Sequence, residues 1–463
     1  MLGVGLWGIT RQETMWRDEA ATWQASQRSV PELWHLVQHV DVVHGLYYLL
    51  MHGVFAVFGD SLPVLRLPSV LAMAGAAAFV ARIGAQRGGA ATGLCAGFAL
   101  ALVPAVQNYA QEGRSYALVT LGAACGTWLL VGLLERPGRA VRWAAYAGVV
   151  LVAAWLNWFA LLLLPAHAVA VLCARPGRAV VVRWTLASAV AVAGTLPLIL
   201  RSRDQSVQVS WIKPLTPGSL TVPALMVVGG VVCAWVSRTR AGGDQDRKRD
   251  RGQGRVSLAA VALPLLALPQ AALLTVSLAK PLYVDRYILF SHLGLALLIG
   301  AAAARGCRAL ARPGVAVAVC VGALGFVLLP VELGQRGPAS RVDDVIAPAN
   351  LVADAARAGD GVLFIPAARR DTALVAPAKF AGLHDVALLQ SPVESGTLKG
   401  VEKDPADIAA GVAAHRRVLL VTDAEGGSTR EADRAKRRAL DAYFVCVADT
   451  RVHGRRVAVY ERR

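Results

Sequence analysis

The stretch SLAAVALPLLALPQAALLTVS at residues 257–277 is apolar along most of its length and contains no charged side chain. At about 1.5 Å per residue, a helix of this length crosses a bilayer core that is about 30 Å thick. Similar runs, rich in Ala, Leu, Val and Gly, recur between residues 67 and 331. The whole chain is 56% hydrophobic and only 17% charged, with a mean hydropathy of +0.49. The sequence therefore predicts a polytopic membrane protein.

We predict an all-α membrane domain with about ten spanning helices. Two of the ten segments are short and flank Asn157, so they form either two half-length helices or one long kinked helix. The ten segments are residues 67–84, 90–107, 116–134, 143–156, 158–174, 183–200, 217–237, 257–277, 286–304 and 313–331.

The loops between the apolar segments are of two kinds. Five loops are rich in arginine, which is typical of the cytoplasmic side of a membrane protein. These loops lie at residues 82–87, 136–142, 175–183, 238–255 and 305–312. They account for much of the formal net charge of +17, so this charge does not indicate a nucleic-acid partner. Within the fourth loop, residues 244–255 read as a polar, flexible linker.

The loops on the opposite side are poorer in Lys and Arg, and the same count places them outside the cytoplasm. They lie at residues 108–115, 201–216 and 279–285. Residues 10–66 and everything after residue 331 fall on this side as well. For this to hold, residues 46–58 cannot cross the bilayer. They form a segment too short to span, which we interpret as a helix lying in the interface.

The segment MWRDEAATW at residues 15–23 contains two adjacent carboxylates, Asp18 and Glu19, flanked by aromatic residues. Carboxylates beside a bilayer are costly to desolvate, so they tend to serve chemistry or to bind an ion. The pair can act as a general base or hold a divalent metal ion through oxygen ligands. The alternative is an acidic pair in a solvated loop or at a helix N-cap.

Further charged and aromatic candidates lie in the outer loops and beside the predicted interfacial helix. Arginines in such positions can bind phosphate through two hydrogen bonds. A base, several arginines and an apolar surround together indicate a lipid-linked phosphate donor. The base would deprotonate an acceptor hydroxyl, and the arginines would stabilise the departing phosphate. The candidates are Asp41, His44, Tyr48, Arg66, Glu112, Arg114, Tyr116, Asp285, Arg286 and Tyr287.

Several of these residues have structural alternatives. Arg66 is also suited to anchoring a helix at the interface, and His44 to a structural role. Asp285 and Arg286 would also form a local ion pair at a helix N-terminus, where Asp favours the dipole. Outside the candidate set, Trp211 reads as an interfacial anchor, and His167 as a histidine satisfied by a neighbour.

After residue 340 the composition becomes polar and no spanning run follows. We predict strands at residues 362–365, 417–422, 444–449 and 455–460, with helices at 351–358 and 429–443. Residues 340–463 would then form a small extracytoplasmic α/β domain whose charged residues are solvated. We find no catalytic constellation in it. The predicted domains are thus a first loop at residues 1–66, a helical membrane domain at 67–335 and this α/β domain.

The seven cysteines lie scattered along the chain and most fall within apolar runs. Neither a zinc site nor a disulfide framework is indicated by their spacing.

Five blocks of the sequence, in order, resemble motifs of a large bacterial family of polytopic glycosyltransferases of the GT-C fold. This family is related to protein O-mannosyltransferases and lipid A aminoarabinose transferases. The resemblance covers roughly residues 1–300. The blocks are WRDEAATW at 16–23, DVVHGLYYLL at 41–50, FGDS at 58–61 with LRLPS at 65–69, YAQEGRSYAL at 109–118, and DRY at 285–287.

The resemblance implies an inverting transferase that uses a polyprenyl-phosphate sugar. It also implies that the acidic pair is catalytic, with Asp18 as the base, and that the first loop carries juxtamembrane helices. Members have a spanning helix before the acidic motif, so Leu2–Ile9 would be the tail of a longer first helix. One departure is Gly45, which stands where the family usually has proline.

We therefore expect a glycosyltransferase of the bacterial cell membrane. It would transfer a mannose- or arabinose-like sugar from a polyprenyl-phosphate donor to a glycan, lipid or protein acceptor outside the cytoplasm. Membrane lipids would surround it, and the only cofactor suggested is a divalent metal at Asp18 and Glu19. A transporter or flippase would instead place charged residues near the bilayer midplane and carry paired repeats, neither of which we find. A non-catalytic scaffold would tolerate Asp18→Asn.

Overall fold

The computed structural model describes residues 1–136, 138–238, 256–308, 312–425 and 430–463. The predicted linker at residues 244–255 lies outside the described residues. The chain forms two compact units, each assembled from two separate stretches of sequence. Met1–Trp7 and Arg66–Glu332 make the first unit, and Gly8–Leu65 and Leu333–Arg463 make the second. The predicted first loop and the predicted C-terminal domain thus contribute to the same unit.

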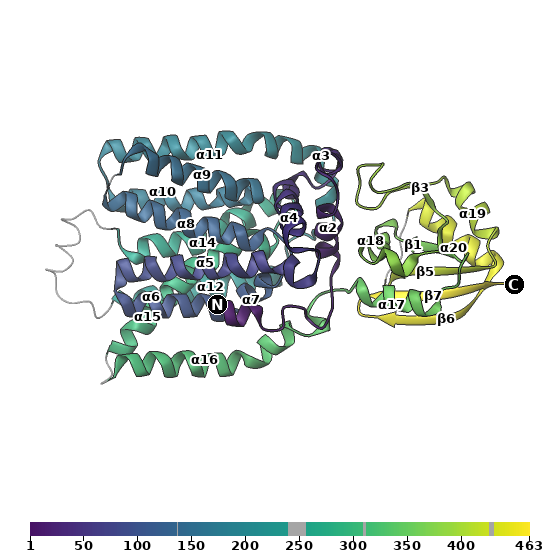
Figure 1. Ribbon diagram of the computed structural model, residues 1–463. Helices are drawn as coiled ribbons and strands as arrows, with labels where there is room; N and C mark the ends of the chain where they lie inside the picture. The colour runs from purple at the N-terminus through teal and green to yellow at the C-terminus, as the bar shows by residue number, and fades with distance from the viewer. Residues whose placement is uncertain (137, 239–255, 309–311, 426–429) are drawn as a thin grey trace. The chain divides into compact units, whose positions relative to one another are not determined.

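Long apolar helices lie side by side in the first unit (Figure 1). Within the described residues, 7 helices are long and apolar enough to cross a membrane. They are α5 (Leu62–Gly88), α8 (Tyr116–Glu135), α11 (Arg178–Asp204), α12 (Pro217–Arg238), α14 (Leu258–Ala279), α15 (His292–Arg308) with the preceding 3₁₀ helix η4 (Asp285–Ser291), and α16 (Pro313–Gln335). The predicted multi-pass membrane architecture is confirmed.

The other apolar helices of this unit are shorter or bent. Helices α6 (Ala90–Leu102) and α7 (Pro104–Ala110) meet at 65° and would make an eighth span if they count as one. On either side of Asn157 lie α9 (Ala140–Leu156) and the pair η2 (Trp158–Leu162) and α10 (Leu163–Ala174). All ten predicted segments are therefore helical, but the two beside Asn157 fall below the length of a full span.

The break at Asn157 has a local cause. The Asn157 backbone is extended, and its side-chain oxygen accepts a hydrogen bond from the backbone N–H of Phe159 at 3.0 Å. An Asn side chain that bonds the backbone in this way competes with the helical hydrogen bonds and starts a new turn. The structure therefore has two helices here, not one kinked helix.

His167 lies buried in α10, between two hydroxyl groups from neighbouring helices. Its Nε2 atom lies 3.0 Å from Thr127 Oγ1, and its Nδ1 atom lies 2.8 Å from the hydroxyl of Tyr146. The prediction that a neighbour satisfies this histidine is confirmed.

The first-loop part of the second unit is helical. It contains α2 (Arg17–Ser26), α3 (Val30–His39), the 3₁₀ helix η1 (Val42–His44) and α4 (Gly45–Phe58). The rings of Trp23 and Phe55 pack edge to face at 5.3 Å and join α2 to α4. The segment predicted to lie in the interface is thus a separate helix, and its depth in the bilayer stays a prediction.

The C-terminal part of the second unit is built on a five-stranded sheet in the order β2-β1-β5-β7-β6. Strands β2, β1 and β5 are parallel, whereas β7 is antiparallel to both β5 and β6. The strands are β1 (Gly361–Ile365), β2 (His384–Asp385), β5 (Arg417–Asp423), β6 (Phe444–Val452) and β7 (Arg455–Arg462), with a separate pair, β3 (Leu388–Gln390) and β4 (Val401–Glu402). All four predicted strands are present.

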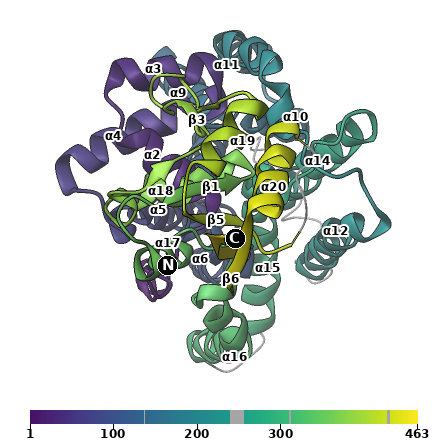
Figure 2. The ribbon, with the colours of Figure 1, turned by 90° about the vertical axis from the view of Figure 1, so that its right-hand side faces the viewer.

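Helices cover both faces of this sheet (Figure 2). Leu363 and Leu420 pack against α19 (Pro405–Ala413) and α20 (Glu431–Tyr443) on one face. Phe364 and Leu419 face the other side, together with α17 (Ile346–Ala355). This alternation along β1 and β5 is what a strand with two buried faces requires.

The charged residues of this domain are not all solvated, contrary to the prediction. The side chains of Arg455 and Lys436 are fully buried, each within an ion-pair network. The prediction was wrong because the partners come from distant parts of the sequence, so a run of mixed charges looks like a solvent-facing surface until it is folded.

Candidate active site

The acidic motif begins helix α2 in the second unit. Trp16 is the N-cap, and Asp18 and Glu19 lie in the first turn. Unpaired N–H groups and the helix dipole favour carboxylates at this end of a helix. The two carboxylates nevertheless differ, because Asp18 is partly exposed whereas Glu19 is 0% exposed. Asp18 is therefore the one of the pair with access to solvent.

Glu19 forms a buried ion pair with Arg11, a residue that the sequence analysis did not single out. Arg11, Gln12 and Glu13 all have positive φ angles, so the chain turns back sharply before α2. This turn carries the Arg11 side chain to Glu19. A buried carboxylate held by a guanidinium is suited to fixing the start of α2.

A second group of predicted residues surrounds the start of α4. The Tyr48 hydroxyl donates a hydrogen bond of 2.7 Å to Asp41 Oδ2. The buried His44 ring lies 6.0 Å from the Tyr48 ring, centre to centre. Asp41 adopts a left-handed conformation with φ 57°, which brings its side chain back over this turn. The structure thus brings Asp41, His44 and Tyr48 together.

Gly45, where the resembled family has proline, closes this turn through its backbone. Its N–H donates to the carbonyl oxygen of Val42, and a Cβ atom at this position would lie 3.1 Å from Val37 Cγ1. Proline has no N–H to make this bond. The glycine therefore replaces the rigidity of proline with a hydrogen bond.

In the first unit, the loop between α7 and α8 is fixed from two sides. The Ser69 hydroxyl donates to the carbonyl oxygen of Glu112 at 2.6 Å. The Gln111 amide donates to the carbonyl oxygens of Gly5 and Trp7 at 2.8 and 2.7 Å. This loop holds the predicted residues Glu112 and Arg114, and Tyr116 begins α8 directly after it; all three are buried. Arg66, also buried, lies one helical turn before Ser69 on α5.

The first residues of η4 contact aromatic residues at the end of α7, at the start of α8 and before α12. The Tyr109 hydroxyl donates to both carboxylate oxygens of Asp285 at 3.2 Å. The Arg286 guanidinium carbon lies 5.7 Å from the ring centre of Tyr116 and 5.3 Å from that of Trp211.

Tyr287 completes this aromatic surround. Its ring stacks on Phe159 with centres 4.8 Å apart and planes within 13°, and it lies 6.2 Å from the Tyr116 ring. Residues of α7, α8 and η2, together with Trp211, therefore surround the segment Asp285–Tyr287. Contact with aromatic rings restricts the orientation of a guanidinium group.

The predicted residues thus divide between the two units. Asp18, Glu19, Asp41, His44 and Tyr48 belong to the second unit, and Arg66, Glu112, Arg114, Tyr116, Asp285, Arg286 and Tyr287 belong to the first. Sequence reasoning missed the contacts of Arg11, Ser69, Tyr109 and Phe159, and it read Trp211 only as an anchor. Tyr109 opens the matched block at residues 109–118, which was the available signal for it.

The metal predicted at Asp18 and Glu19 stays a prediction. Within the described residues, no three His, Cys, Asp or Glu side chains gather as metal ligands would. At Glu19 the guanidinium of Arg11 already supplies a positive charge.

Neither the scan of known protein families nor the search of curated proteins found a match to this sequence. Among solved structures, ArnT from Cupriavidus metallidurans in the apo state is similar, with a TM-score of 0.60 and 13% identity over 95% of this chain and 93% of that one. The same protein bound to undecaprenyl phosphate is similar with a TM-score of 0.57 and 14% identity, over 99% of this chain and 96% of that one. ArnT is the lipid A aminoarabinose transferase, a GT-C fold glycosyltransferase. The chain therefore has the ArnT fold, which confirms the GT-C-like fold expected from its motifs.

Proposed function

We propose that this protein is a membrane glycosyltransferase that takes a sugar from a polyprenyl-phosphate donor. The observation that carries the proposal is the ArnT-like fold, which extends over nearly the whole chain. ArnT with undecaprenyl phosphate bound has this same fold, which supports a polyprenyl-linked donor here. Fold alone does not define chemistry, so the reaction is assigned from the residues of the site.

Asp18 is the proposed general base. An acceptor hydroxyl would pass its proton to Asp18 as its oxygen attacks the anomeric carbon of the sugar. The bond from that carbon to the phosphate oxygen breaks, and polyprenyl phosphate leaves with the bonding electrons. Attack opposite the leaving group inverts the anomeric centre. The partial exposure of Asp18 supports this role, since a base must reach its substrate.

Arg286 and Arg114 are the proposed contacts to the donor phosphate. As the glycosidic bond breaks, negative charge grows on the phosphate, and fixed guanidinium groups stabilise it. The rings of Trp211 and Tyr116 support Arg286 in this role, because they limit the directions in which its N–H groups can point. Arg66 and Glu112 would complete the polar surface near Arg114.

The remaining residues would orient these groups and the reactants. Asp285 bonds Tyr109, and Tyr287 stacks on Phe159, so both fix the segment that carries Arg286. We assign Asp41, His44 and Tyr48 to sugar or acceptor contacts because their polar groups converge at one turn. The proposed sugar is mannose- or arabinose-like, and the acceptor a glycan, lipid or protein outside the cytoplasm.

The test uses the purified full chain in liposomes, with polyprenyl-phosphate donors whose sugar is radiolabelled. Donors bearing mannose and arabinose are supplied together with extracted glycans, lipids and proteins as acceptors. A transferase moves label to an acceptor and releases polyprenyl phosphate. Movement of intact donor between leaflets without cleavage would instead support a flippase and overturn the proposal, as would the absence of transfer from every donor.

A further inference from the structure

The carboxyl edge of the parallel strands is where sheets of this kind bind ligands. In this domain β1 ends at Ile365 and β5 ends at Asp423. Arg455, the first residue of β7, pairs in register with Asp423 and so lies at the same edge. A binding partner of the C-terminal domain is therefore expected at this edge.

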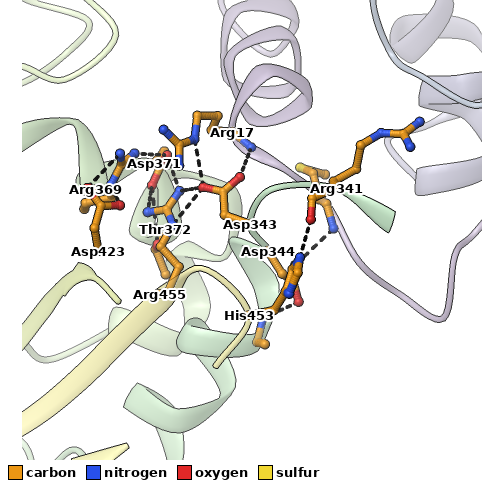
Figure 3. Close-up of polar contacts among 12 residues, drawn as sticks. Arg17, Arg341, Asp343, Asp344, Arg369, Asp371, Thr372, Asp423, His453 and Arg455 are labelled. Atoms are coloured by element: carbon orange, nitrogen blue, oxygen red, sulfur yellow. Dashed lines mark hydrogen bonds and ion pairs between the residues drawn. The ribbon is translucent and has the colours of Figure 1, made fainter. Parts of the chain in front are cut away.

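A chain of ion pairs crosses this edge (Figure 3). Arg455 binds Asp371 through two bonds of 2.9 Å, and its Nε donates to Asp343 Oδ2 at 3.0 Å. Arg369 extends the chain to Asp423 at 2.6 Å. The side chains of Arg455 and Asp343 are both 0% exposed. Buried charges of this kind need every partner in place, because a lone one is costly.

The same network binds the segment that leads into the acidic motif. Asp343 accepts hydrogen bonds from the Arg17 backbone N–H at 3.3 Å and from its Nε at 2.9 Å. Asp344 accepts from the Met15 N–H at 3.1 Å, and the Val345 N–H donates to the Met15 carbonyl oxygen at 2.7 Å. Residues 343–345 thus hold residues 15–17 on both backbone and side chain.

Asp18 follows directly after this clamped segment. Helix α2 spans only 10 residues, and helices shorter than about 12 residues are marginal on propensity alone. The position of its first turn is therefore set by tertiary bonds. Those bonds come from Asp343 and Asp344 before Asp18, and from Arg11 to Glu19 after it.

We propose that Asp343 is a positioning residue for the transfer reaction, through which the C-terminal domain holds the base Asp18 in place. The inference rests on the proposed function. It gives the C-terminal domain a role in catalysis, although the sequence showed no catalytic residues there. The edge of the sheet, where a ligand would otherwise bind, binds residues 15–17 of the same chain.

The matched variants are Asp343→Asn and Asp433→Asn. Asp433 is also a buried carboxylate of this domain, but it pairs with Lys436 on α20 and does not contact residues 15–17. Asn at position 343 presents an NH₂ donor to the guanidinium donors of Arg17 and Arg455, so the side-chain bonds that hold Arg17 are lost. We expect Asp343→Asn to lower kcat by about tenfold or more with the donor KM within about twofold, because small misplacements of a reacting group are costly. Asp433→Asn should leave kcat within about twofold of wild type.

Hydrogen exchange gives a readout that does not depend on the reaction. Peptides covering residues 15–26 should exchange faster in Asp343→Asn than in Asp433→Asn. If Asp343→Asn does not fold, Arg17→Met removes the side-chain bond to Asp343 from the other partner. The Arg17 side chain is 39% exposed, so this change is easier to tolerate. Arg17→Lys should then restore part of kcat, because it returns a positively charged donor to Asp343.

Equal kcat values for Asp343→Asn and Asp433→Asn, or equal exchange at residues 15–26, would overturn the positioning role. These outcomes differ from failure of the proposed function. In that case the wild type transfers no sugar, or Asp18→Asn transfers it at the wild-type rate, whatever the exchange shows.

Discussion

The Arg286 guanidinium lies against two aromatic rings, 5.3 Å from the centre of Trp211 and 5.7 Å from that of Tyr116. Trp211 is 57% exposed, so this arrangement is reachable from outside the unit. Contact with both rings restricts the orientation of the guanidinium. The planar fork of arginine matches phosphate geometry, whereas a lysine ammonium is only a point charge.

Arg286→Ala should weaken binding of polyprenyl phosphate by about 10- to 100-fold, since a hydrogen bond to a charged group is worth about 1.5–3 kcal/mol. Arg286→Lys should recover only part of the loss. The dissociation constant in detergent micelles measures the effect. The control is Arg201→Ala, which removes a half-exposed arginine at the end of α11. Wild-type affinity in Arg286→Ala would remove this residue from the phosphate site.

At the scale of the elements, α6 and α15 approach each other closely at a glycine. A Cβ atom added at Gly300 would lie 2.5 Å from the backbone nitrogen of Ala96 and 2.6 Å from its Cα. Gly306 lies on the same helix, and a Cβ atom there would meet nothing within 4 Å. The two glycines therefore form a matched pair.

Gly300→Val should destabilise the first unit by about 3 kcal/mol or more, because overpacking against backbone forces the helices apart. Gly306→Val should not destabilise the first unit and could stabilise it by up to about 0.5 kcal/mol, because valine has a somewhat higher helix propensity than glycine. Unfolding in mixed micelles with increasing denaturing detergent compares the two. Equal unfolding midpoints would show that α6 and α15 are not packed as described.

The ion-pair chain at the sheet edge makes the second unit sensitive to acid. Burial alone would raise the pKa of Asp343, but Arg455 and Arg17 outweigh it and hold the pKa below its ordinary value. A lowered pKa in the folded state adds stability that is complete above the unfolded value of about 3.9. This stability is lost as the pH falls through the lower, folded value.

The unfolding free energy of the second unit should therefore fall when the pH drops below about 4, and this loss should be smaller in Asp343→Asn. Hydrogen exchange of β7 amides at about pH 3 and about pH 7, each corrected for the intrinsic exchange rate at that pH, measures it in the full chain. An acid dependence that is the same in wild type and Asp343→Asn would show that this carboxylate is not the group responsible.

For the molecule as a whole, the elements were easier to predict than the contacts between them. Apolar runs predicted the long helices that the structure describes in the first unit, because the bilayer demands long apolar segments. Strands β1 and β5 could be predicted equally well, because each is a short apolar run. Periodicity cannot show that Arg455 pairs with Asp343, 112 residues away, or that Arg11 turns back to Glu19. The candidate site residues predicted from the sequence lie in ordered motifs, and the residues that contact them were missed.

The sidedness predicted from the arginine-rich loops can be tested across the whole chain. Cys446 is an exposed thiol on β6 and serves as a native probe of the C-terminal domain. In right-side-out vesicles, a chain that retains only Cys446 should react with a membrane-impermeant maleimide. A chain whose only cysteine comes from Arg139→Cys, in the predicted cytoplasmic loop before α9, should react only after permeabilisation. The reverse pattern would invert the predicted topology.

The central claim is that Asp18 removes the proton from the acceptor. The most direct measurement is the single-turnover rate of sugar transfer by Asp18→Asn, compared with Glu13→Gln, an exposed carboxylate a few residues earlier. We expect Asp18→Asn to slow transfer by about 10²- to 10⁴-fold and Glu13→Gln to transfer at the wild-type rate. Transfer by Asp18→Asn at the wild-type rate would show that Asp18 is not the base.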